Sequence, residues 1–413
     1  MLFWMHLVAG MAAGLVILLM SVTGVALTYQ KQMLEWADGR DVPSAPFLAQ
    51  APPLPPETLL RAAAAARPRA APTGLSRRAA PGAPATVTFD GGAALLVDPY
   101  RGVVIGEPSP RLRAFFRAVT NWHRWLALEG ASRATGRLIS GVANLAFLFI
   151  VLSGVYLWVP RVWTGLQFRQ VLWFRGGLAP KARDFNWHNV VGFWSAVPLA
   201  VVVAGAVPIS FQWGGNLVYR LVGETPPVSA RGPQRSAAHT PGERASPPSA
   251  AFDGLDEAWA RAEGHVPGWR AISGRLGGPP EAPLAFTIDR GYGGQPHKRG
   301  TLTVDRASGT VVAWRTFADL SAGQRLRSWL RFAHTGEYYG LAGQTVAGFA
   351  SAGGAVLVYT GLALAWRRGR AWRRGRIVST AVARVAGRPR SVELGPGRAC
   401  LSGLSAGSTR RRG

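Results

Sequence analysis

Four long apolar runs divide the sequence, and stretches rich in Ala, Pro, Gly and Arg lie between them. The first run, Leu2–Leu27, contains no charged residue, and the third follows His188 without a charge as far as Trp213. A helix of about 20 apolar residues crosses a hydrocarbon core of about 30 Å. The pattern predicts an α-helical membrane protein with transmembrane helices at residues 1–28, 138–160, 187–213 and 341–366.

The first run has two interpretations, a cleaved signal peptide or a retained helix. It lacks a basic region before the apolar residues, has no A-x-A cleavage motif and is long for a signal sequence. We therefore expect a retained helix. Gly10 and Gly14 lie on the same helical face as His6. They fit either a helix–helix contact or a groove for a flat ligand.

Two polar segments, 29–112 and 214–324, lie between apolar runs. Each contains strand-like runs and turns, and Pro-rich linkers occur at 49–56 and 226–249. The runs that fit a helix or a strand are 57–66, 86–89, 94–97 and 103–105 in the first segment, and 252–263, 285–289, 300–305 and 311–315 in the second. Each segment is expected to form an α+β domain. An aromatic and basic stretch follows each one, at 113–137 and 325–340, and is typical of a helix on a membrane surface.

The arginines indicate the topology. The loop 161–186 carries five basic residues against Asp184, and a run of arginines follows the fourth helix. Because Lys and Arg concentrate in short cytoplasmic loops, both chain ends and this loop should be cytoplasmic, and both α+β domains extracytoplasmic. We expect a bacterial inner membrane location, contact with membrane lipid, and a basic, disordered tail at 367–413.

Composition excludes several classes. The formal net charge of +26 comes almost entirely from arginine, and the sequence contains no nucleic-acid-binding motif, so nucleic acid is not expected as a partner. Cys400 is the single cysteine, which excludes intramolecular disulfides, thiolate zinc sites and iron–sulfur clusters. A metal centre would have to use His, Met or carboxylates.

The two halves of the sequence correspond as tandem repeats. LVDPYRG at 96–102 matches TVDRASG at 303–309, and the dipeptide Ser153-Gly154 matches Thr360-Gly361. His6 matches His188 at the start of the first and third helices. His123 and His334 both precede the next spanning helix. Each half therefore reads as a helix, an α+β domain, a surface helix containing a histidine, and a returning helix.

The repeat changes the interpretation of the histidines. One histidine on an apolar face is usually structural, but four of the seven occupy equivalent places in two repeats. Neutral imidazole binds haem iron, zinc and copper. Zinc requires more ligands at one point, whereas a pair on one side of the membrane suits the two axial positions of a b-type haem. We expect the pairs His6–His188 and His123–His334.

Other polar residues complete this picture. Arg124 and Arg331 could pair with haem propionates or with lipid headgroups, and the sequence leaves both open. His239, His265 and His297 lie in polar stretches and are interpreted as surface residues, with His297 the one that could touch a ligand.

These features together resemble the PepSY-associated transmembrane family. The resemblance rests on the four-helix plan with two external domains, the histidines that head the first and third helices, Trp122-His123-Arg124, SGVYLWVPR at 153–161, the two VD turns and HTGEYYG at 334–340. It covers about residues 1–375 and implies PepSY-like external domains. It also implies two b haems, and reduction of ferric siderophores or other iron-chelates by electrons from an unidentified cytoplasmic or quinol donor.

Two other functions fit the same plan. The protein could be a non-catalytic PepSY regulator or protease inhibitor, or an accessory permease for an iron-chelate. The absence of a nucleophile–base arrangement agrees with electron transfer, and the absence of carboxylates within the apolar runs makes a transport path difficult to draw.

Overall fold

The computed structural model describes residues 1–40, 52–159, 164–227, 252–276 and 282–386. Its helices are α1 (Leu2–Leu27), α2 (Gln30–Gly39), α3 (Pro56–Ala66), α4 (Pro110–Trp125), α5 (Arg133–Trp158), α6 (Gly165–Leu172), α7 (Pro180–Ser210), α8 (Gln212–Leu221), α9 (Leu255–His265), α10 (Ala322–His334) and α11 (Gly340–Ala386). Its strands are β1 (Pro72–Arg78), β2 (Ala85–Phe89), β3 (Ala94–Val97), β4 (Val104–Gly106), β5 (Ala271–Arg275), β6 (Leu284–Asp289), β7 (Arg299–Val304) and β8 (Val311–Thr316). Residues 49–51 of the first linker and 228–249 of the second lie outside the described residues, as does His239.

Among the described residues, four helical stretches are long and apolar enough to cross a membrane. They are Leu2–Gly39, Gly130–Trp158, Pro180–Ser210 and Glu337–Arg373. They correspond in number and order to the four predicted transmembrane helices. Many of their apolar side chains are exposed, including Leu15, Val142 and Val197, as expected for surfaces that face lipid. The protein is a membrane protein.

The spanning helices pack around a small apolar core. α1 packs against α5, and α5 packs against α7. Ile17, Phe147, Val151, Leu199, Val203 and Ala350 form the core. Some glycines permit close packing, because a Cβ on Gly354 would lie only 2.9 Å from the hydroxyl of Ser21, whereas one on Gly14 would make an ordinary contact with Leu362 at 3.5 Å. Gly14 is thus a helix-contact residue, whereas a Cβ on Gly10 would meet nothing within 4 Å.

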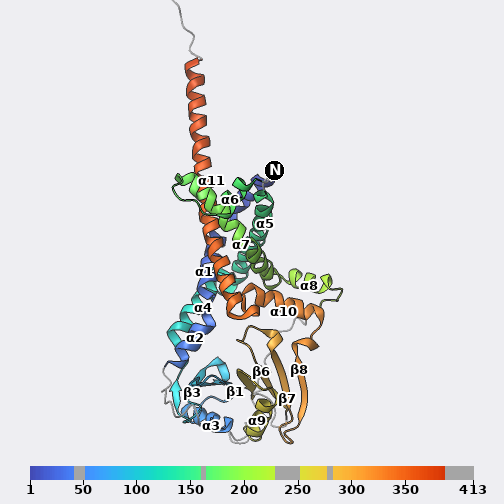
Figure 1. Ribbon diagram of the computed structural model, residues 1–413. Coiled ribbons are helices and arrows are strands. Elements are labelled where there is room, and N and C mark those ends of the chain that lie inside the picture. Colours follow the sequence, from blue (N-terminus) through green and yellow to red (C-terminus); the bar gives the residue numbers. More distant parts are fainter. Residues whose placement is uncertain (41–51, 160–163, 228–251, 277–281, 387–413) are drawn as a thin grey trace, which may run out of the picture. The chain divides into compact units, whose positions relative to one another are not determined.

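All eight strands belong to one antiparallel sheet, in the order β4-β3-β2-β1-β5-β6-β7-β8 (Figure 1). The strands of the first segment and those of the second segment meet at its centre. There β1 pairs with β5 from Gly74–Arg275 to Arg78–Ala271. Each segment was expected to form its own domain, but their strands share a single sheet. The two segments are therefore joined by a backbone ladder.

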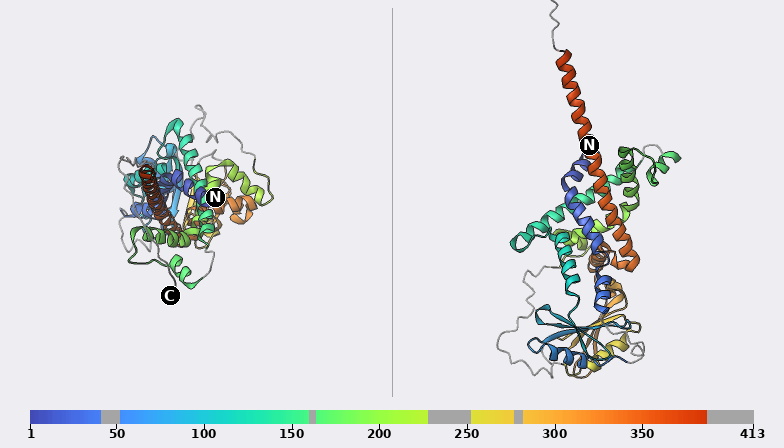
Figure 2. Two further views of the ribbon diagram at one scale, coloured as in Figure 1. Left: turned by 90° about the horizontal axis from the view of Figure 1, so that it is seen from above. Right: turned by 90° about the vertical axis from the view of Figure 1, so that its left-hand side faces the viewer.

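One face of the sheet is covered by α3 and α9, as Figure 2 shows from the side. Successive side chains of a strand point to opposite faces of the sheet, and apolar residues occupy the face toward the helices. Val87, Ile272, Phe286 and Leu302 lie on that face and are fully buried. Trp259 of α9 packs edge-on against Phe286. The opposite face carries Ser, Thr and Arg side chains, and Ser76 and Ser273 are hydrogen-bonded there.

Three predicted boundaries are wrong. α7 begins at Pro180 instead of residue 187, because Pro at the first turn of a helix needs no backbone donor. It ends at Ser210, so Trp213 belongs to the separate helix α8. α11 continues to Ala386, which contradicts disorder in the first part of the 367–413 tail. Arginine is a good helix former and can extend a helix beyond its apolar part.

The two segments predicted as surface helices, 113–137 and 325–340, contain α4 and α10, which start three residues earlier and end at Trp125 and His334. Leu126 and Ala127 follow α4 with φ of 53° and 56°, a left-handed turn that ends the helix. At its start, α10 has a capping box formed by Ser321 and Gln324, and Glu224 accepts hydrogen bonds from Ser321 and from the backbone N–H of Gly323. Both helices end within two residues of a histidine, which places His123 and His334 at their C-terminal ends.

Candidate functional site: two pairs of histidines

The inner pair of histidines, His6 and His188, comes from α1 and α7. Nδ1 of His6 lies 2.9 Å from the hydroxyl of Ser153 in α5, and Nδ1 of His188 lies 2.9 Å from the hydroxyl of Thr360 in α11. Two histidines on separate helices are therefore held by the same kind of contact.

The outer pair, His123 and His334, comes from α4 and α10. The centroids of the two rings are 6.3 Å apart and the rings are tilted by 47°. Nδ1 of His123 lies 2.9 Å from the hydroxyl of Thr23 in α1, and Nδ1 of His334 lies 2.7 Å from the carbonyl of Val202 in α7.

The hydrogen bonds determine which ring nitrogen carries the proton. A carbonyl can only accept, so Nδ1–H of His334 donates to Val202. The three hydroxyls already donate to carbonyls of their own helices, Thr23 to Leu19, Ser153 to Ile150 and Thr360 to Val356. Each hydroxyl can then only accept from its histidine, so Nδ1 is the donor in all four rings. Nε2 keeps its lone pair, which is the arrangement that metal-bound histidines adopt.

The spacing of the outer pair fits two axial ligands of one metal. A metal–nitrogen bond of about 2.0 Å, with roughly 1.1 Å more to each ring centre, places two opposed imidazole centres about 6 Å apart. The observed separation of 6.3 Å agrees with this value. Among the described residues, no group of three or more His, Cys, Asp or Glu gathers at one point.

A cavity of 630 Å³ adjoins the outer pair, within the usual size of cofactor sites. Its lining includes both histidines, Arg124, Arg331 and the apolar side chains of Met20, Phe147 and Leu199. It also extends between α2 and α4, to Lys31, Asp38 and Arg113. The cavity therefore has an apolar part, suited to a macrocycle, and a charged part.

Arg124 and Arg331 give this cavity a positive charge. Burial, followed by the nearby guanidinium of Arg331, lowers the pKa of Arg124. Neither arginine forms an ion pair with a carboxylate in the part of the chain that the structure describes. Two guanidinium groups beside an apolar cavity are a suitable site for carboxylates, such as the propionates of a porphyrin.

The outer histidines are neutral at pH 7. Burial, with a further contribution from His334, lowers the pKa of His123 to about 4. Burial also lowers the pKa of His334, and the charge of Arg331 acts in the same direction. A neutral imidazole is the form that binds a metal.

A glycine lies against each of the four histidines. A Cβ on Gly154 or Gly361 would lie 3.4 Å from Cε1 of His6 or His188, and one on Gly24 would lie 3.6 Å from Cε1 of His123. A Cβ on Gly205 would lie 3.1 Å from Cβ of His334 and 2.5 Å from the carbonyl oxygen of Leu330. The glycines therefore let the helices carrying the histidines approach their neighbours.

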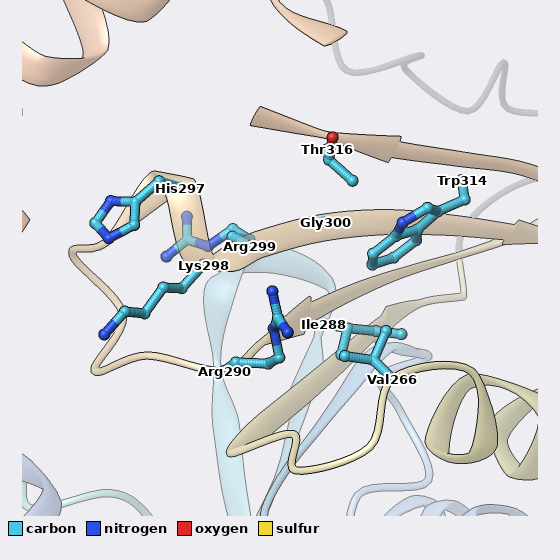
Figure 3. Close-up of a pocket in the computed structure, with 9 residues that line it drawn as sticks. All are labelled: Val266, Ile288, Arg290, His297, Lys298, Arg299, Gly300, Trp314 and Thr316. Carbon is cyan, nitrogen blue, oxygen red and sulfur yellow. The ribbon is translucent and has the colours of Figure 1, made fainter. Parts of the chain in front are cut away.

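The structure brings His123 and His334 together, places His6 and His188 each against a hydroxyl, and lines the outer cavity with Arg124 and Arg331. The sequence reasoning missed the hydrogen-bond acceptors Thr23, Ser153, Thr360 and the Val202 carbonyl. A signal was present, because each of the three hydroxyl residues directly precedes one of the glycines that adjoin the histidines. His265 contacts Trp314 in the sheet, and His297 lies beside a small cavity of the β6–β7 hairpin (Figure 3).

Comparison with known proteins identifies the family. The model of one family, the PepSY-associated TM region, matches residues 3–368. No match was found among curated proteins. The family match includes all four spanning helices, the sheet and both histidine pairs. The chain therefore belongs to the PepSY-associated transmembrane family.

Proposed function

We propose that the protein is a haem b-containing oxidoreductase of the bacterial inner membrane that passes electrons across the membrane to reduce ferric chelates, such as siderophores, in the periplasm. The observation that carries this proposal is the state of the four histidines. Each has Nδ1 held by a hydrogen bond and Nε2 free of one among the described residues, and the outer two rings are 6.3 Å apart, a separation at which both could bind one metal ion.

Haem b, when bound, would supply a centre that gains and loses one electron at a time. The residues of this chain have the other roles. His6 and His188 would hold one haem, and His123 and His334 the other. Ser153, Thr360, Thr23 and the Val202 carbonyl orient the imidazoles, and Arg124 and Arg331 would neutralise propionates at the outer site. The buried apolar core that includes Phe147 and Leu199 would limit the access of water to the space between the two pairs.

The topology gives electron flow its direction. The basic loop 161–186 and the arginines after α11 favour a cytoplasmic location for both chain ends, with the sheet in the periplasm. The inner pair would then lie toward the cytoplasm, next to a cytoplasmic or quinol donor. The outer pair would lie on the side of the sheet, where a ferric chelate could approach.

The proposed reaction needs no acid–base group. One electron from the donor reduces Fe(III) in the chelate to Fe(II), and no covalent bond to the protein forms or breaks. Hard oxygen ligands hold ferric iron more tightly than ferrous iron, so reduction loosens the chelate. This chemistry agrees with a site composed of histidines, arginines and apolar side chains.

The test is the absorption spectrum of the purified full-length protein, expressed with haem supplied and then reduced with dithionite. We expect the α-band of b haem and two haems per chain. His188→Ala and His334→Ala should each remove one haem. His265→Ala, which changes an exposed histidine outside both pairs, should remove none. A colourless wild-type protein, or full haem content in both pair variants, would refute the proposal.

A further inference from the structure

A second, smaller cavity lies in the sheet at the β6–β7 hairpin. It measures about 50 Å³ and is lined by residues of β6, β7, β8 and the hairpin (Figure 3). Trp314 forms one wall, where it packs flat over Gly300, and His265 supports the ring from outside at a centroid distance of 5.0 Å. A cavity of this size admits one small polar group of a ligand, since a water molecule takes up about 30 Å³.

The other end of this cavity is positively charged. Arg290, Lys298 and Arg299 line it, together with His297 (Figure 3). Arg299 forms an ion pair with Asp289 at 3.2 Å. Arg290 and Lys298 are exposed, and within the described ranges neither has a carboxylate partner. The guanidinium of Arg290 points toward β7, and the side chain of Lys298 extends from the same region away from Trp314 (Figure 3), so these two cationic groups border the cavity.

The hairpin that carries these residues contacts the chain just after the outer histidine pair. The ring of His297 lies 4.6 Å from that of Tyr338, which belongs to the short helix η6 (Glu337–Tyr339). Gly294 of the hairpin packs against the side chain of Glu337, and Gln295 packs against Gly340. η6 follows His334 by two residues, so the hairpin that lines this cavity contacts the segment of chain next to one histidine of the outer pair.

We infer that this cavity binds an anionic oxygen group, a carboxylate, of the ferric chelate. Arg290 and Lys298 would contact the carboxylate, Trp314 would pack against the carbon atoms that carry it, and the rest of the chelate would remain outside, next to η6. The inference rests on the proposed function for the identity of the ligand. Binding itself requires no electron transfer and can be measured separately.

The experiment uses gallium(III) citrate, a redox-inert equivalent of an anionic ferric chelate. It is titrated calorimetrically into the full-length protein in nanodiscs of phosphatidylcholine. Arg290→Gln and Lys298→Gln should each weaken binding about tenfold, the usual loss for one charge-assisted hydrogen bond. Arg275→Gln, at an exposed arginine of β5 outside the cavity, should not change the affinity. A cationic trihydroxamate complex of gallium should bind wild type and variants equally.

Equal affinity for gallium citrate in all variants would overturn the inference. A lipid phosphate presents the same chemistry, so the titration is repeated in nanodiscs that contain phosphatidylglycerol. If that lipid abolishes binding of gallium citrate, the cavity is a headgroup site and the inference fails. A protein that binds gallium citrate through Arg290 but has no haem spectrum would refute the proposed function while retaining the anion site.

Discussion

Thr360 in α11 accepts a hydrogen bond from the ring of His188 in α7, at 2.9 Å, while its own proton goes to the carbonyl of Val356 at 2.8 Å. The hydroxyl thereby fixes both the orientation and the tautomer of the histidine. Ser153 has the same relationship to His6, with Ile150 as its acceptor. Because these contacts involve no ligand, they determine the geometry of the inner pair before any cofactor arrives.

The first prediction follows from this contact. Thr360→Val keeps the shape of the side chain but removes the acceptor, so the ring of His188 is no longer oriented. Loss of such a hydrogen bond typically weakens metal binding about 10- to 100-fold. We expect reduced retention of the inner haem when the protein is challenged with apomyoglobin as a haem acceptor. Thr345→Val, in the same helix but away from the histidines, should retain haem as the wild type does. Equal retention in the two variants would count against the role of Thr360.

Gly205 provides a steric test at the outer pair. A Cβ at this position would approach the backbone of α10 at the Leu330 carbonyl, so Gly205→Ala should push α10 away from α7 and displace His334. Overpacking of this kind costs about 1–3 kcal/mol. We expect a lower thermal midpoint and a changed outer haem spectrum. Gly14→Ala is the matched control, because its Cβ would make an ordinary contact with Leu362. A Gly205→Ala protein with the wild-type midpoint and spectrum would contradict the packing of α10 on α7.

Glu224 should make the stability of the first turn of α10 depend on pH. Hydrogen bonds, first from Ser321 and then from the backbone of Gly323, lower the pKa of its carboxyl below the usual 4.5. A carboxyl with a lowered pKa in the folded state adds stability above its unfolded pKa and loses it as the pH falls through the folded value. Glu224→Gln should therefore increase hydrogen exchange at the start of α10 at pH 7, and the difference from wild type should shrink in acid and vanish as the pH falls through the lowered pKa of Glu224.

Glu257→Gln, which changes an exposed acid in α9, is the control for this pH effect. Its exchange profile in α10 should follow the wild type at every pH. A difference between Glu224→Gln and wild type that persisted unchanged into the acid range would show that charge is not the cause.

A substitution of Arg77 tests whether the two halves of the sheet are coupled through the pairing of β1 with β5. It lies in β1 with 6% of its side chain exposed, forms an ion pair with Glu263 of α9, and stacks over Trp259 and Trp269. Arg77→Met should destabilise the sheet by about 2–3 kcal/mol, less than for a fully buried pair because Glu263 keeps contact with solvent. Hydrogen exchange in β1 and β5 should accelerate together. Arg61→Met, which breaks an exposed pair with Glu57, should change exchange little. Acceleration in β1 alone would argue against a shared ladder.

The elements that the sequence predicted are those with a local signal. The apolar runs were long enough to identify α1, α5, α7 and α11, and the alternating residues of β3, β6 and β7 placed those strands within a residue of their observed bounds. β1 and β5 were missed because PTGLSRR and AISGR have few β-branched residues. Their strand conformation comes from pairing with each other at the centre of the sheet, which is a tertiary effect.

The candidate site likewise contains residues that the sequence predicted and residues that it could not predict. The four histidines were identified because they recur at equivalent places, and the basic residues predicted which of them share a side of the membrane. Their acceptors could not be predicted, since Thr23 reaches His123 and Val202 reaches His334 only through the packing of α1 on α4 and of α7 on α10. Whether the pairs hold haem remains a proposal for the experiments above.

The central ladder of the sheet has a mechanical consequence for the helices. Lys31 of α2 bonds to the carbonyl of Tyr292 in the β6–β7 hairpin, and Glu35 pairs with Arg78 at the end of β1. The segment after α1 and the β6–β7 hairpin near η6 are therefore both connected to the paired strands of the one sheet. An electron carrier exchanges charge fastest when its ligands do not move as the charge changes. The sheet restrains how far the helices can move apart. It would therefore keep the reorganisation energy for electron transfer at the outer pair small.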